Sequence, residues 1–304
     1  MHRVINRVIH RENDDISSKE LPYCGRLRYG LLGRAISYAL SPVIHNTWFV
    51  GRKIEAVFDL IDVPGYEHTV LDGAWQRGYR GLCVTVPYKT HVMSYPGLRL
   101  DAVAQSVGAA NVLRHDGNDD LGCPIVSATN TDALAICDVF QEVGIGGAKA
   151  VVLGAGGAAM ATLWALKQCG IGGLTLAVRD VKKAEALRSL GGVSVDSVIP
   201  IESLSDICAD IFVNATPLGR KGEIPPTPKG VSCVVDWVYQ PREDLDVVPP
   251  LAITTENDFP ALTQPTPLIQ RAKRQGLSVI DGESLLIGQA RRAFSFWFGD
   301  FCAD

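Results

Sequence analysis

A glycine-rich turn between two apolar segments is the part of this sequence whose residue types and spacing most clearly indicate chemistry. The apolar run Lys149–Leu153 (KAVVL) leads into Gly154–Ala159 (GAGGAA), and an apolar helical pattern follows. In such a unit Gly154 allows a tight turn, Gly156 lets the backbone approach a pyrophosphate, and Gly157 begins a helix whose free N–H groups attract an anion. A purely structural turn is the alternative. We expect a dinucleotide to bind at Gly154, Ala155, Gly156, Gly157 and Ala158.

The residues after the next strand carry charges that select the cofactor. Gly173–Val178 is followed by Arg179-Asp180, and then by Lys182 and Lys183. An acidic residue here binds the ribose hydroxyls and repels a 2′-phosphate, whereas arginine accommodates that phosphate. Because three positive charges outweigh one negative charge, the sequence favours NADP, with NAD as the alternative. If no cofactor binds here, Asp180 is merely the cap of a solvated basic helix.

These groups need a scaffold of parallel strands, and the chain shows the pattern of one. Strand-like and helix-like segments alternate, which is typical of an α/β protein. Besides the two named above, strands are expected at Tyr29–Leu32, Glu55–Val63, Gly81–Val86, Val193–Val198, Asp210–Asn214 and Val231–Trp237. Helices are expected from Ser41-Pro42 onward with Ser41 as N-cap, and at Glu67–Arg77 and Asp132–Val143. Asn111–Val126 predicts a hairpin that turns at Asp116-Gly117-Asn118. The head up to about Glu20 and the segment Gln240–Pro265 lack this pattern.

Length and composition exclude several classes of protein. The 304 residues suffice for about two domains. Lys and Arg total 29 against 33 Asp and Glu, so the net charge of −4 gives no general attraction to nucleic acid. The uncharged run Ala150–Leu166 is too short and too glycine-rich to span a membrane.

The eight cysteines are scattered, with no CxxC pair and no zinc-type spacing to histidine. Such thiols are typical of a reduced compartment. We therefore expect a cytoplasmic protein without a bound metal and without a targeting segment. His45 is expected to pack or cap within its helix.

Six further motifs follow one another in a fixed order: LSPVIHN (Leu40–Asn46), VTVPYK (Val84–Lys89), GAANVL (Gly108–Leu113), NTD (Asn130–Asp132), VNATPLG (Val213–Gly219) and DGESLLIGQA (Asp281–Ala290). Together with the glycine turn they resemble shikimate dehydrogenase and its relatives, the quinate/shikimate dehydrogenases. The resemblance covers the chain from about Tyr29 to Trp297.

The resemblance implies two α/β domains that face each other across a cleft. Residues 1–130 would form the substrate-binding catalytic domain, completed by residues 282–304, and residues 131–281 would form an NAD(P)-binding Rossmann domain. The implied activity is the reversible NADP-dependent reduction of 3-dehydroshikimate to shikimate.

The resemblance also assigns roles to single residues. Lys89 and Asp132 match the catalytic pair, and Asn214, Thr216 and Leu218 match the loop beside the cofactor. A lysine ammonium can stabilise the charge that develops on a carbonyl oxygen and donate the proton, and Asp132 would orient it. The implied substrate-binding residues are Ser41, Thr85, Asn111, Tyr239 and Gln289.

Two departures from the family pattern keep alternatives open. The family's Ser-x-Ser pair, which holds the substrate carboxylate, is Ala39 and Ser41 here. Quinate or a related cyclohexene acid, oxidised with NAD, is therefore an alternative substrate, and a non-catalytic ligand-sensing relative is an alternative of another class. An inserted segment at about 242–265 separates Tyr239 from Thr266-Pro267-Leu268 and would form a lid, an interface or a surface loop. A small-molecule substrate is the expected partner, and the chain would be a monomer or a homodimer.

Overall fold

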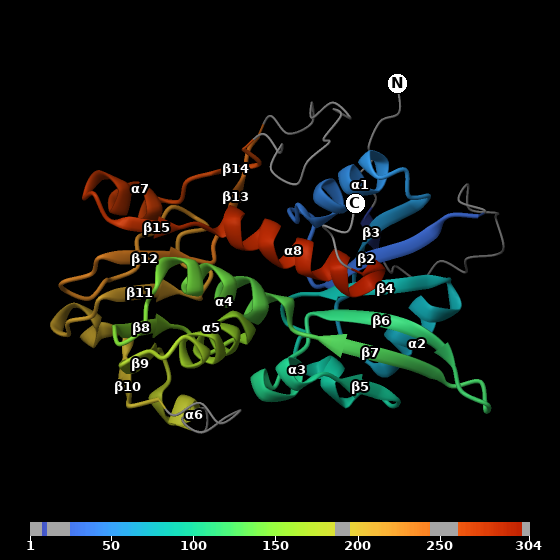
Figure 1. The fold of residues 1–304 in the computed structure, drawn as a ribbon, viewed down its shortest axis with the longest axis horizontal. Coiled ribbons are helices and arrows are strands. Elements are labelled where there is room, and N and C mark those ends of the chain that lie inside the picture. Colours follow the sequence, from blue (N-terminus) through green and yellow to red (C-terminus); the bar gives the residue numbers. More distant parts are fainter. Residues whose placement is uncertain (1–7, 11–24, 186–194, 244–260, 300–304) are drawn as a thin grey trace.

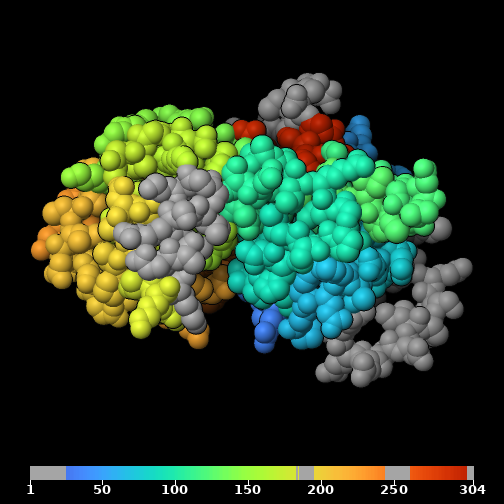
Figure 2. Space-filling view, turned by 90° about the horizontal axis from the view of Figure 1, so that it is seen from below, coloured from blue at the N-terminus to red at the C-terminus, as the bar shows by residue number. Residues whose placement is uncertain are grey.

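The computed structural model describes residues 8–10, 25–185, 195–243 and 261–299. In these residues the chain folds as two α/β domains, each built on its own sheet (Figure 1). The two domains lie side by side, as the space-filling view also shows (Figure 2).

The first sheet mixes parallel and antiparallel pairs in the order β1-β3-β2-β4-β6-β7-β5. β6 pairs antiparallel with β4 and β7, and every other pair is parallel. Its strands are β1 (Val8–His10), β2 (Leu27–Gly33), β3 (Ala56–Asp62), β4 (Tyr79–Val84), β5 (Leu98–Leu100), β6 (Val112–Asn118) and β7 (Pro124–Thr129).

Helices cover both faces of this sheet because neighbouring strand residues point to opposite sides. Leu31 and Cys83 pack on one face with α1 (Ser41–Gly51), whereas Leu32 and Leu82 pack on the other with α2 (His68–Gln76). Two short helical segments, η1 (His91–Ser94) and α3 (Ala102–Val107), complete this part of the chain.

The second sheet is parallel throughout, in the order β10-β9-β8-β11-β12-β15. Counted in chain order this is 3-2-1-4-5-6, the strand order of Rossmann folds, whose ligands bind where the order reverses. The reversal lies between β8 and β11. The strands are β8 (Lys149–Leu153), β9 (Gly173–Val178), β10 (Ser197–Pro200), β11 (Ile211–Asn214), β12 (Cys233–Asp236) and β15 (Ser278–Ile280).

Two apolar clusters cover the faces of the second sheet. One involves α4 (Thr131–Val143) and α5 (Gly157–Gln168), and the other involves α7 (Pro267–Arg274) and η3 (Ile201–Asp206). The short α6 (Val181–Glu185) follows β9. A small antiparallel pair joins β13 (Gln240–Pro241) to β14 (Thr263–Gln264), so it holds together the two ends of the inserted segment, whose residues 244–260 lie outside the described part.

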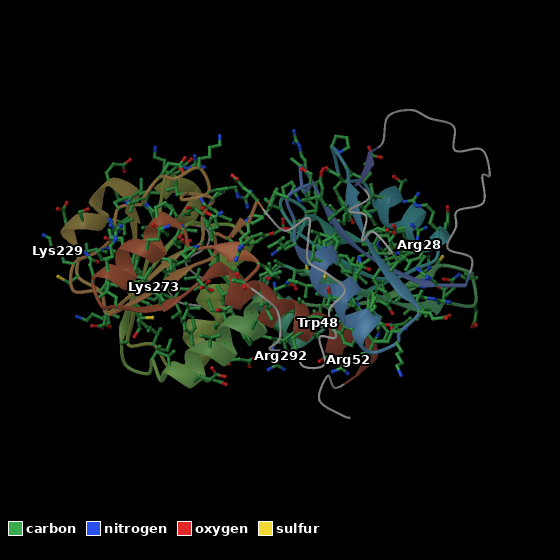
Figure 3. The ribbon with its side chains drawn as sticks, turned by 90° about the horizontal axis from the view of Figure 1, so that it is seen from above. Arg28, Trp48, Arg52, Lys229, Lys273 and Arg292 are labelled. Atoms are coloured by element: carbon green, nitrogen blue, oxygen red, sulfur yellow. The ribbon has the colours of Figure 1, made fainter. Side chains whose placement is uncertain are left out.

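The last helix, α8 (Gly282–Phe298), returns to the first domain and packs on α1 (Figure 1, Figure 3). The ring of Trp297 on α8 lies 4.8 Å from that of Tyr29, tilted by 40°, and its indole N–H donates to the carbonyl of Leu113 at 3.0 Å. A β-carbon on Gly81 would lie 2.4 Å from the Trp297 Nε1, so strand β4 needs glycine there. Residues of α8 therefore share an apolar cluster with α1 and β2.

Three local expectations are wrong. Ser41 is not the N-cap of α1: Leu40 holds that position in a helical conformation, which leaves no extended residue to cap the helix. The hairpin turns at 119–123 and not at Asp116-Gly117-Asn118, because the Asp119 carboxylate accepts from the N–H groups of Leu121 and Cys123. The N-terminal head holds a strand, β1, that pairs with β3. The expected strand Val193–Val198 begins in residues outside the described part, and β10 starts at Ser197.

Candidate active site

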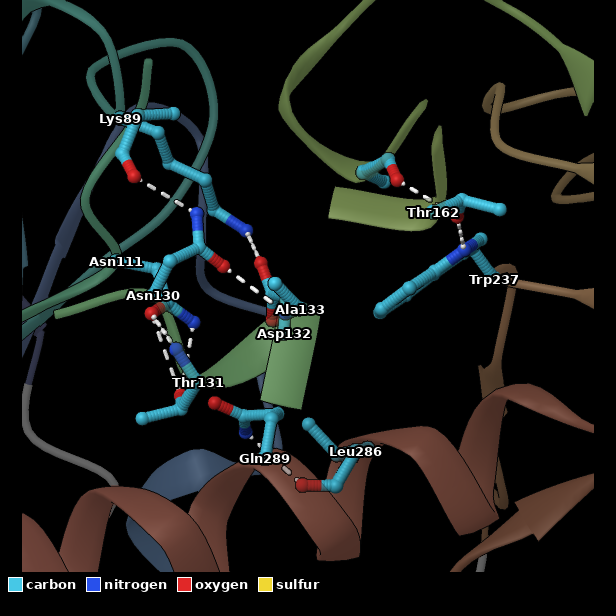
Figure 4. A network of polar contacts seen from close by, with 12 residues as sticks. Lys89, Asn111, Asn130, Thr131, Asp132, Ala133, Thr162, Trp237, Leu286 and Gln289 are labelled. Carbon is cyan, nitrogen blue, oxygen red and sulfur yellow. Dashed lines mark hydrogen bonds and ion pairs between the residues drawn. The ribbon is translucent and has the colours of Figure 1, made fainter. Parts of the chain in front are cut away.

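Lys89 and Asp132 form an ion pair between the two domains (Figure 4). Lys89 follows β4 in a turn, and Asp132 lies in the first turn of α4. Both side chains are largely buried, with 16% and 6% of their surfaces exposed. Such burial shields the pair from screening by salt, so the carboxylate holds the ammonium in one place.

An amide network fixes the backbone on which Asp132 stands. Asn130 caps α4 by accepting from the N–H of Ala133, and its own amide donates to the carbonyl of Ala109. Asn111 accepts from the Thr131 N–H at 2.7 Å and donates to the Thr131 hydroxyl at 3.0 Å (Figure 4). The N-terminus of α4 is therefore held from both sides.

The loop that carries Lys89 is tied to neighbouring strands. The carbonyl of Lys89 accepts from the N–H of Ala110, and the N–H of Thr85 donates to the carbonyl of Leu32. A β-carbon on Gly33 would lie 2.5 Å from the Thr85 methyl, so the loop after β2 lies directly against the loop after β4. Ser41 is buried at the start of α1, and its hydroxyl makes no hydrogen bond to another described residue. The Lys89 ammonium is bonded to Asp132, and no hydrogen bond joins it to the side chain of Thr85 or Ser41.

The glycine turn joins β8 to α5, as the sequence predicts. Gly154 adopts a φ of +117°, and a β-carbon there would lie 2.9 Å from the carbonyl oxygen of Ala215, so both conformation and space require glycine. A β-carbon on Gly156 would meet no protein atom within 4 Å, which leaves open space before the first turn of α5. Ala155 is exposed, whereas Gly157 and Ala158 are partly buried. This open space beside free helix N–H groups fits a pyrophosphate.

Gly157 connects this turn to the ion pair. A β-carbon at position 157 would lie 3.1 Å from Cδ of Lys89, so the lysine chain rests on the first residue of α5. The expected proton donor and the expected cofactor site are thus direct neighbours.

The loop after β11 is held by a buried carboxylate that was not among the predicted residues. Asp236 ends β12 in register with Asn214, and both are fully buried. The carboxylate accepts from the Asn214 amide at 2.9 Å, from the Thr266 hydroxyl at 2.5 Å, and from the N–H of Val238. Burial raises the pKa of Asp236, and these donors oppose the increase. A polar residue at the end of an apolar strand, matching Asn214 one strand away, is the sequence signal that could have revealed it.

The side chain of Asn214, fixed by Asp236, in turn holds the residues beside the glycine turn by hydrogen bonds. Its side-chain oxygen accepts from the Thr216 hydroxyl at 2.7 Å, and its amide also donates to the carbonyl of Leu218 at 2.8 Å. A β-carbon on Gly154 would lie 2.9 Å from the Thr216 methyl. Of the three loop residues that the resemblance implies for the cofactor, Thr216 therefore lies at the glycine turn, and Asn214 and Leu218 are hydrogen-bonded to Thr216.

Two residues beyond the predicted set connect the same loops across the domains. The guanidinium of Arg220 lies over the ring of Tyr38, 4.2 Å from its centre, and the Tyr38 ring lies 6.3 Å from that of Tyr239. Burial is the main cause that raises the pKa of Tyr239, and the nearby Tyr38 raises it further. Arg220 and a backbone hydrogen bond to Leu40 lower it. Tyr239 thus lies next to the loop that leads to Ser41.

The remaining predicted residues lie farther from these contacts. Gln289 is buried on α8, donates to the carbonyl of Leu286, and faces the start of α4 (Figure 4). Arg179 and Asp180 are exposed after β9, where the sequence expects the 2′-phosphate. Lys183 lies in α6, and its side chain is outside the described part.

The described residues give little support to other kinds of site. No group of three or more His, Cys, Asp or Glu in this part of the chain is arranged to hold a metal ion. No helix among them is long and apolar enough to cross a membrane. His45 packs between aromatic rings, stacked on Phe58 at 4.4 Å.

A pocket of about 510 Å³ lies at β5 and β7, lined among others by Asp72, Arg99 and Asp119, and contains no predicted site residue. The Lys89 region is the stronger candidate, because its charged groups are buried, paired and adjacent to the glycine turn.

Comparisons with known proteins agree with this geometry. The family model described as the shikimate dehydrogenase substrate binding domain matches residues 31–113. Shikimate dehydrogenase (NADP(+)) of Rubrobacter xylanophilus is 34% identical over 283 residues, which cover 89% of this chain and 90% of that protein. The same enzyme of Caldanaerobacter subterraneus is 30% identical over 291 residues, covering 90% and 92%.

Solved structures give the same result over nearly the whole fold. Shikimate 5-dehydrogenase of Thermus thermophilus, solved in complex with NADP(H) and shikimate, superposes with a TM-score of 0.69 at 26% identity and covers 90% of this chain and 94% of that one. Shikimate dehydrogenase 1 of Peptoclostridium difficile gives a TM-score of 0.71 at 25% identity, covering 91% and 94%. With relatives this similar along both domains, the chain belongs to the shikimate dehydrogenase family.

Proposed function

We propose that this protein catalyses the reversible NADP-dependent reduction of 3-dehydroshikimate to shikimate. The observation that carries the proposal is the buried Lys89–Asp132 pair resting on Gly157, the first residue of the glycine helix. It brings a proton donor next to the place where the residues fit a dinucleotide. Relatives named for this NADP-dependent activity support it.

Lys89 has the chemistry and the position for proton transfer. When bound, the nicotinamide cofactor supplies the hydride. Lys89 Nζ would donate its proton to the substrate oxygen during reduction and accept one from the hydroxyl during oxidation. Asp132, which accepts a hydrogen bond from that Nζ, would orient the ammonium and hold it ready between turnovers.

Neutral hydrogen-bonding groups are proposed to hold the substrate. Ser41, Thr85, Asn111, Tyr239 and Gln289 offer hydroxyl and amide groups that suit a ring with several hydroxyls. The oxygen of Asn111 already accepts from Thr131, so the amide hydrogen that is free of Thr131 would face the ligand.

The cofactor-binding assignment uses residues at two places. The backbone at Gly154, Ala155, Gly156, Gly157 and Ala158 would hold the pyrophosphate, bordered by Asn214, Thr216 and Leu218. The side chain of Arg179 would meet the 2′-phosphate, with Asp180 and Lys183 beside it. Arg179 and Asp180, both exposed directly after β9, support placing the 2′-phosphate there.

Domain limits, compartment and assembly belong to the same proposal. All strands of the first sheet precede Asn130, and all strands of the second lie between Lys149 and Ile280. This supports a substrate domain of residues 1–130 with 282–304 and a cofactor domain of 131–281.

Six cysteines of the described residues are free thiols, which supports a reducing cytoplasm. A monomer or a homodimer remains the proposed assembly.

A panel of substrates and cofactors tests the function. We expect kcat/KM to be highest for shikimate with NADP among the four combinations of shikimate or quinate with NADP or NAD. Quinate with NAD is the second candidate: Ala39, which is buried and leaves more room than a serine, favours quinate, and the acidic Asp180 favours NAD. A higher kcat/KM for quinate with NAD would replace the first proposal by the second. Tight binding without turnover of any cyclic hydroxy acid would instead indicate a non-catalytic relative.

A further inference from the structure

Arg220 connects loops of the two domains. It belongs to the loop after β11, yet its guanidinium lies 4.2 Å from the ring centre of Tyr38, in the loop between β2 and α1. A guanidinium held over an aromatic face is attracted by the ring, and its N–H groups stay free at the edge of the plane. The contact therefore positions the cation and leaves its donors available.

The backbone under Arg220 is also held in place. Gln240 donates from its side-chain amide to the carbonyls of Gly219 and Arg220, at 2.9 and 3.1 Å. Gly219 adopts a φ of +104°, and its N–H donates to the carboxylate of Glu223 at 3.2 Å. The loop thus directs this arginine toward Tyr38.

Two carboxylates near these loops are held by backbone N–H groups and not by Arg220: Glu223 accepts from Gly219 and Lys221, and Asp62 accepts from Ala35 and Ile36. Lys89 is neutralised by Asp132, so the pair offers no net charge to a ligand. Arg220 makes no ion pair within the described part of the chain. Its charge stands next to Tyr38, which lies beside Tyr239 and three residues before Ser41, whose hydroxyl is without a described partner.

We propose that Arg220 determines specificity by binding the carboxylate of the substrate, with Tyr38 as the surface that positions its guanidinium. The inference depends on the proposed function, because it concerns the acid group of that substrate. An Arg–carboxylate contact can be bidentate, so it selects both the charge and the orientation of the ring. A cofactor phosphate is the other anion at hand, but the residues that fit phosphates lie at Gly156 and after β9, whereas Arg220 reaches the substrate domain.

The test compares an acid with its ester. Arg220→Met removes the charge and keeps much of the chain length, and Arg220→Lys keeps the charge but loses the planar fork. Shikimate and shikimate methyl ester are assayed with NADP, and KM and kcat are measured for each. We expect Arg220→Met to raise the KM for shikimate by about 10- to 100-fold, the usual effect of losing a charged hydrogen bond. The kcat/KM for the ester should change less than twofold, and Arg220→Lys should fall in between.

A matched control removes a different exposed charge. Arg34 lies in the same loop as Tyr38, and Arg34→Met should leave the acid-to-ester ratio as in the wild type. The proposal is overturned if Arg220→Met leaves the KM for shikimate within twofold of the wild-type value, or if kcat/KM falls by the same factor for the acid and the ester. It is also overturned if the KM for NADP rises instead of the KM for shikimate. Failure of the proposed function shows differently, as absence of shikimate turnover in the wild type.

Discussion

The aliphatic chain of Lys89 lies against the backbone of Gly157, so that a β-carbon at position 157 would be 3.1 Å from Cδ of the lysine. Lys89 comes from the domain of the first sheet, and Gly157 begins the glycine helix of the second. The contact brings the proposed proton donor directly against the proposed cofactor site.

Gly157→Ala should therefore reduce turnover without preventing folding. Alanine suits a helix start, but its methyl group would push the Lys89 chain away from its position. At 3.1 Å the Lys89 chain has to give way by only a few tenths of an ångström. Since a misplacement of about 1 Å can cost roughly 100-fold in rate, we expect kcat to fall by up to about tenfold, with a smaller change in the KM for NADP. Steady-state kinetics of shikimate oxidation measures both constants.

Gly156→Ala is the matched comparison. A β-carbon at 156 would meet no protein atom within 4 Å, but it would enter the space that we propose for the pyrophosphate. This variant should raise the KM for NADP more than it lowers kcat. Equal effects of the two substitutions on both constants would contradict the assignment of the glycine turn.

Lys89→Ala should abolish most of the activity. General acid–base catalysis contributes about 10²- to 10⁴-fold, so kcat should fall by that range while the protein stays folded. Asp132→Asn keeps an acceptor for the Lys89 ammonium but no charge, and a smaller loss is expected. Lys167→Ala, at an exposed lysine of α5, serves as the control. Retention of most of the wild-type turnover by Lys89→Ala would refute the mechanism.

Local patterns were sufficient to predict the elements that are buried on both faces. β8 and β9 have the bounds that the apolar runs indicate, because each strand is flanked by neighbours in a parallel sheet and needs a continuous apolar sequence. The glycine turn follows from the same local logic. Both depend on residues close together in the chain.

Where two local signals compete, the sequence did not predict the outcome. Asp116-Gly117-Asn118 looks like a turn, but Gly117 uses its φ of +109° in an irregular part of β6, and the hairpin turns only after Asp119. Two contacts between distant segments were not predicted. Arg220 reaches Tyr38, and Lys89 reaches Gly157, only because the two domains fold against each other.

Asp236 should matter chiefly for stability. Asp236→Ala would leave three buried donors, on Asn214, Val238 and Thr266, without an acceptor. Since each unsatisfied group costs about 1–3 kcal/mol, we expect the free energy of unfolding to drop by roughly 3 kcal/mol or more, as measured in urea. Asp236→Asn keeps one oxygen and should lose less. Asp138→Ala, which breaks an exposed pair with Arg292, should cost under about 1 kcal/mol, and an equal loss for both alanine variants would contradict this role.

Arg179→Gln tests the preference for NADP. The exposed guanidinium after β9 would lose its charge while a polar chain of similar reach remains. The KM for NADP should rise about tenfold or more, whereas the KM for NAD should stay within twofold. Lys273→Gln, at an exposed lysine of α7, controls for the loss of one surface charge. Equal changes in the two KM values would place the 2′-phosphate elsewhere.

His45 should make the fold sensitive to acid. Its imidazole is fully buried against aromatic rings, and neither ring nitrogen has a hydrogen-bond partner among the described residues. Burial lowers its pKa from 6.5 to about 3. The unfolded chain therefore takes up a proton near pH 6.5, whereas the folded chain does so only near pH 3, so the contribution of His45 to stability is complete above pH 6.5 and is lost as the pH falls between these values.

His45→Phe removes this titration and keeps the stacking on Phe58. The uptake of one proton on unfolding changes the free energy of unfolding by about 1.4 kcal/mol per pH unit. The free energy of unfolding of the variant should therefore rise relative to that of the wild type by roughly this amount for each pH unit below 6. Urea unfolding at a series of pH values from 7 to 4.5 measures the difference, and His91→Gln, at an exposed histidine, controls for the loss of an imidazole. Parallel stability curves for His45→Phe and the wild type would show that His45 takes up its proton in the folded state as readily as in the unfolded one.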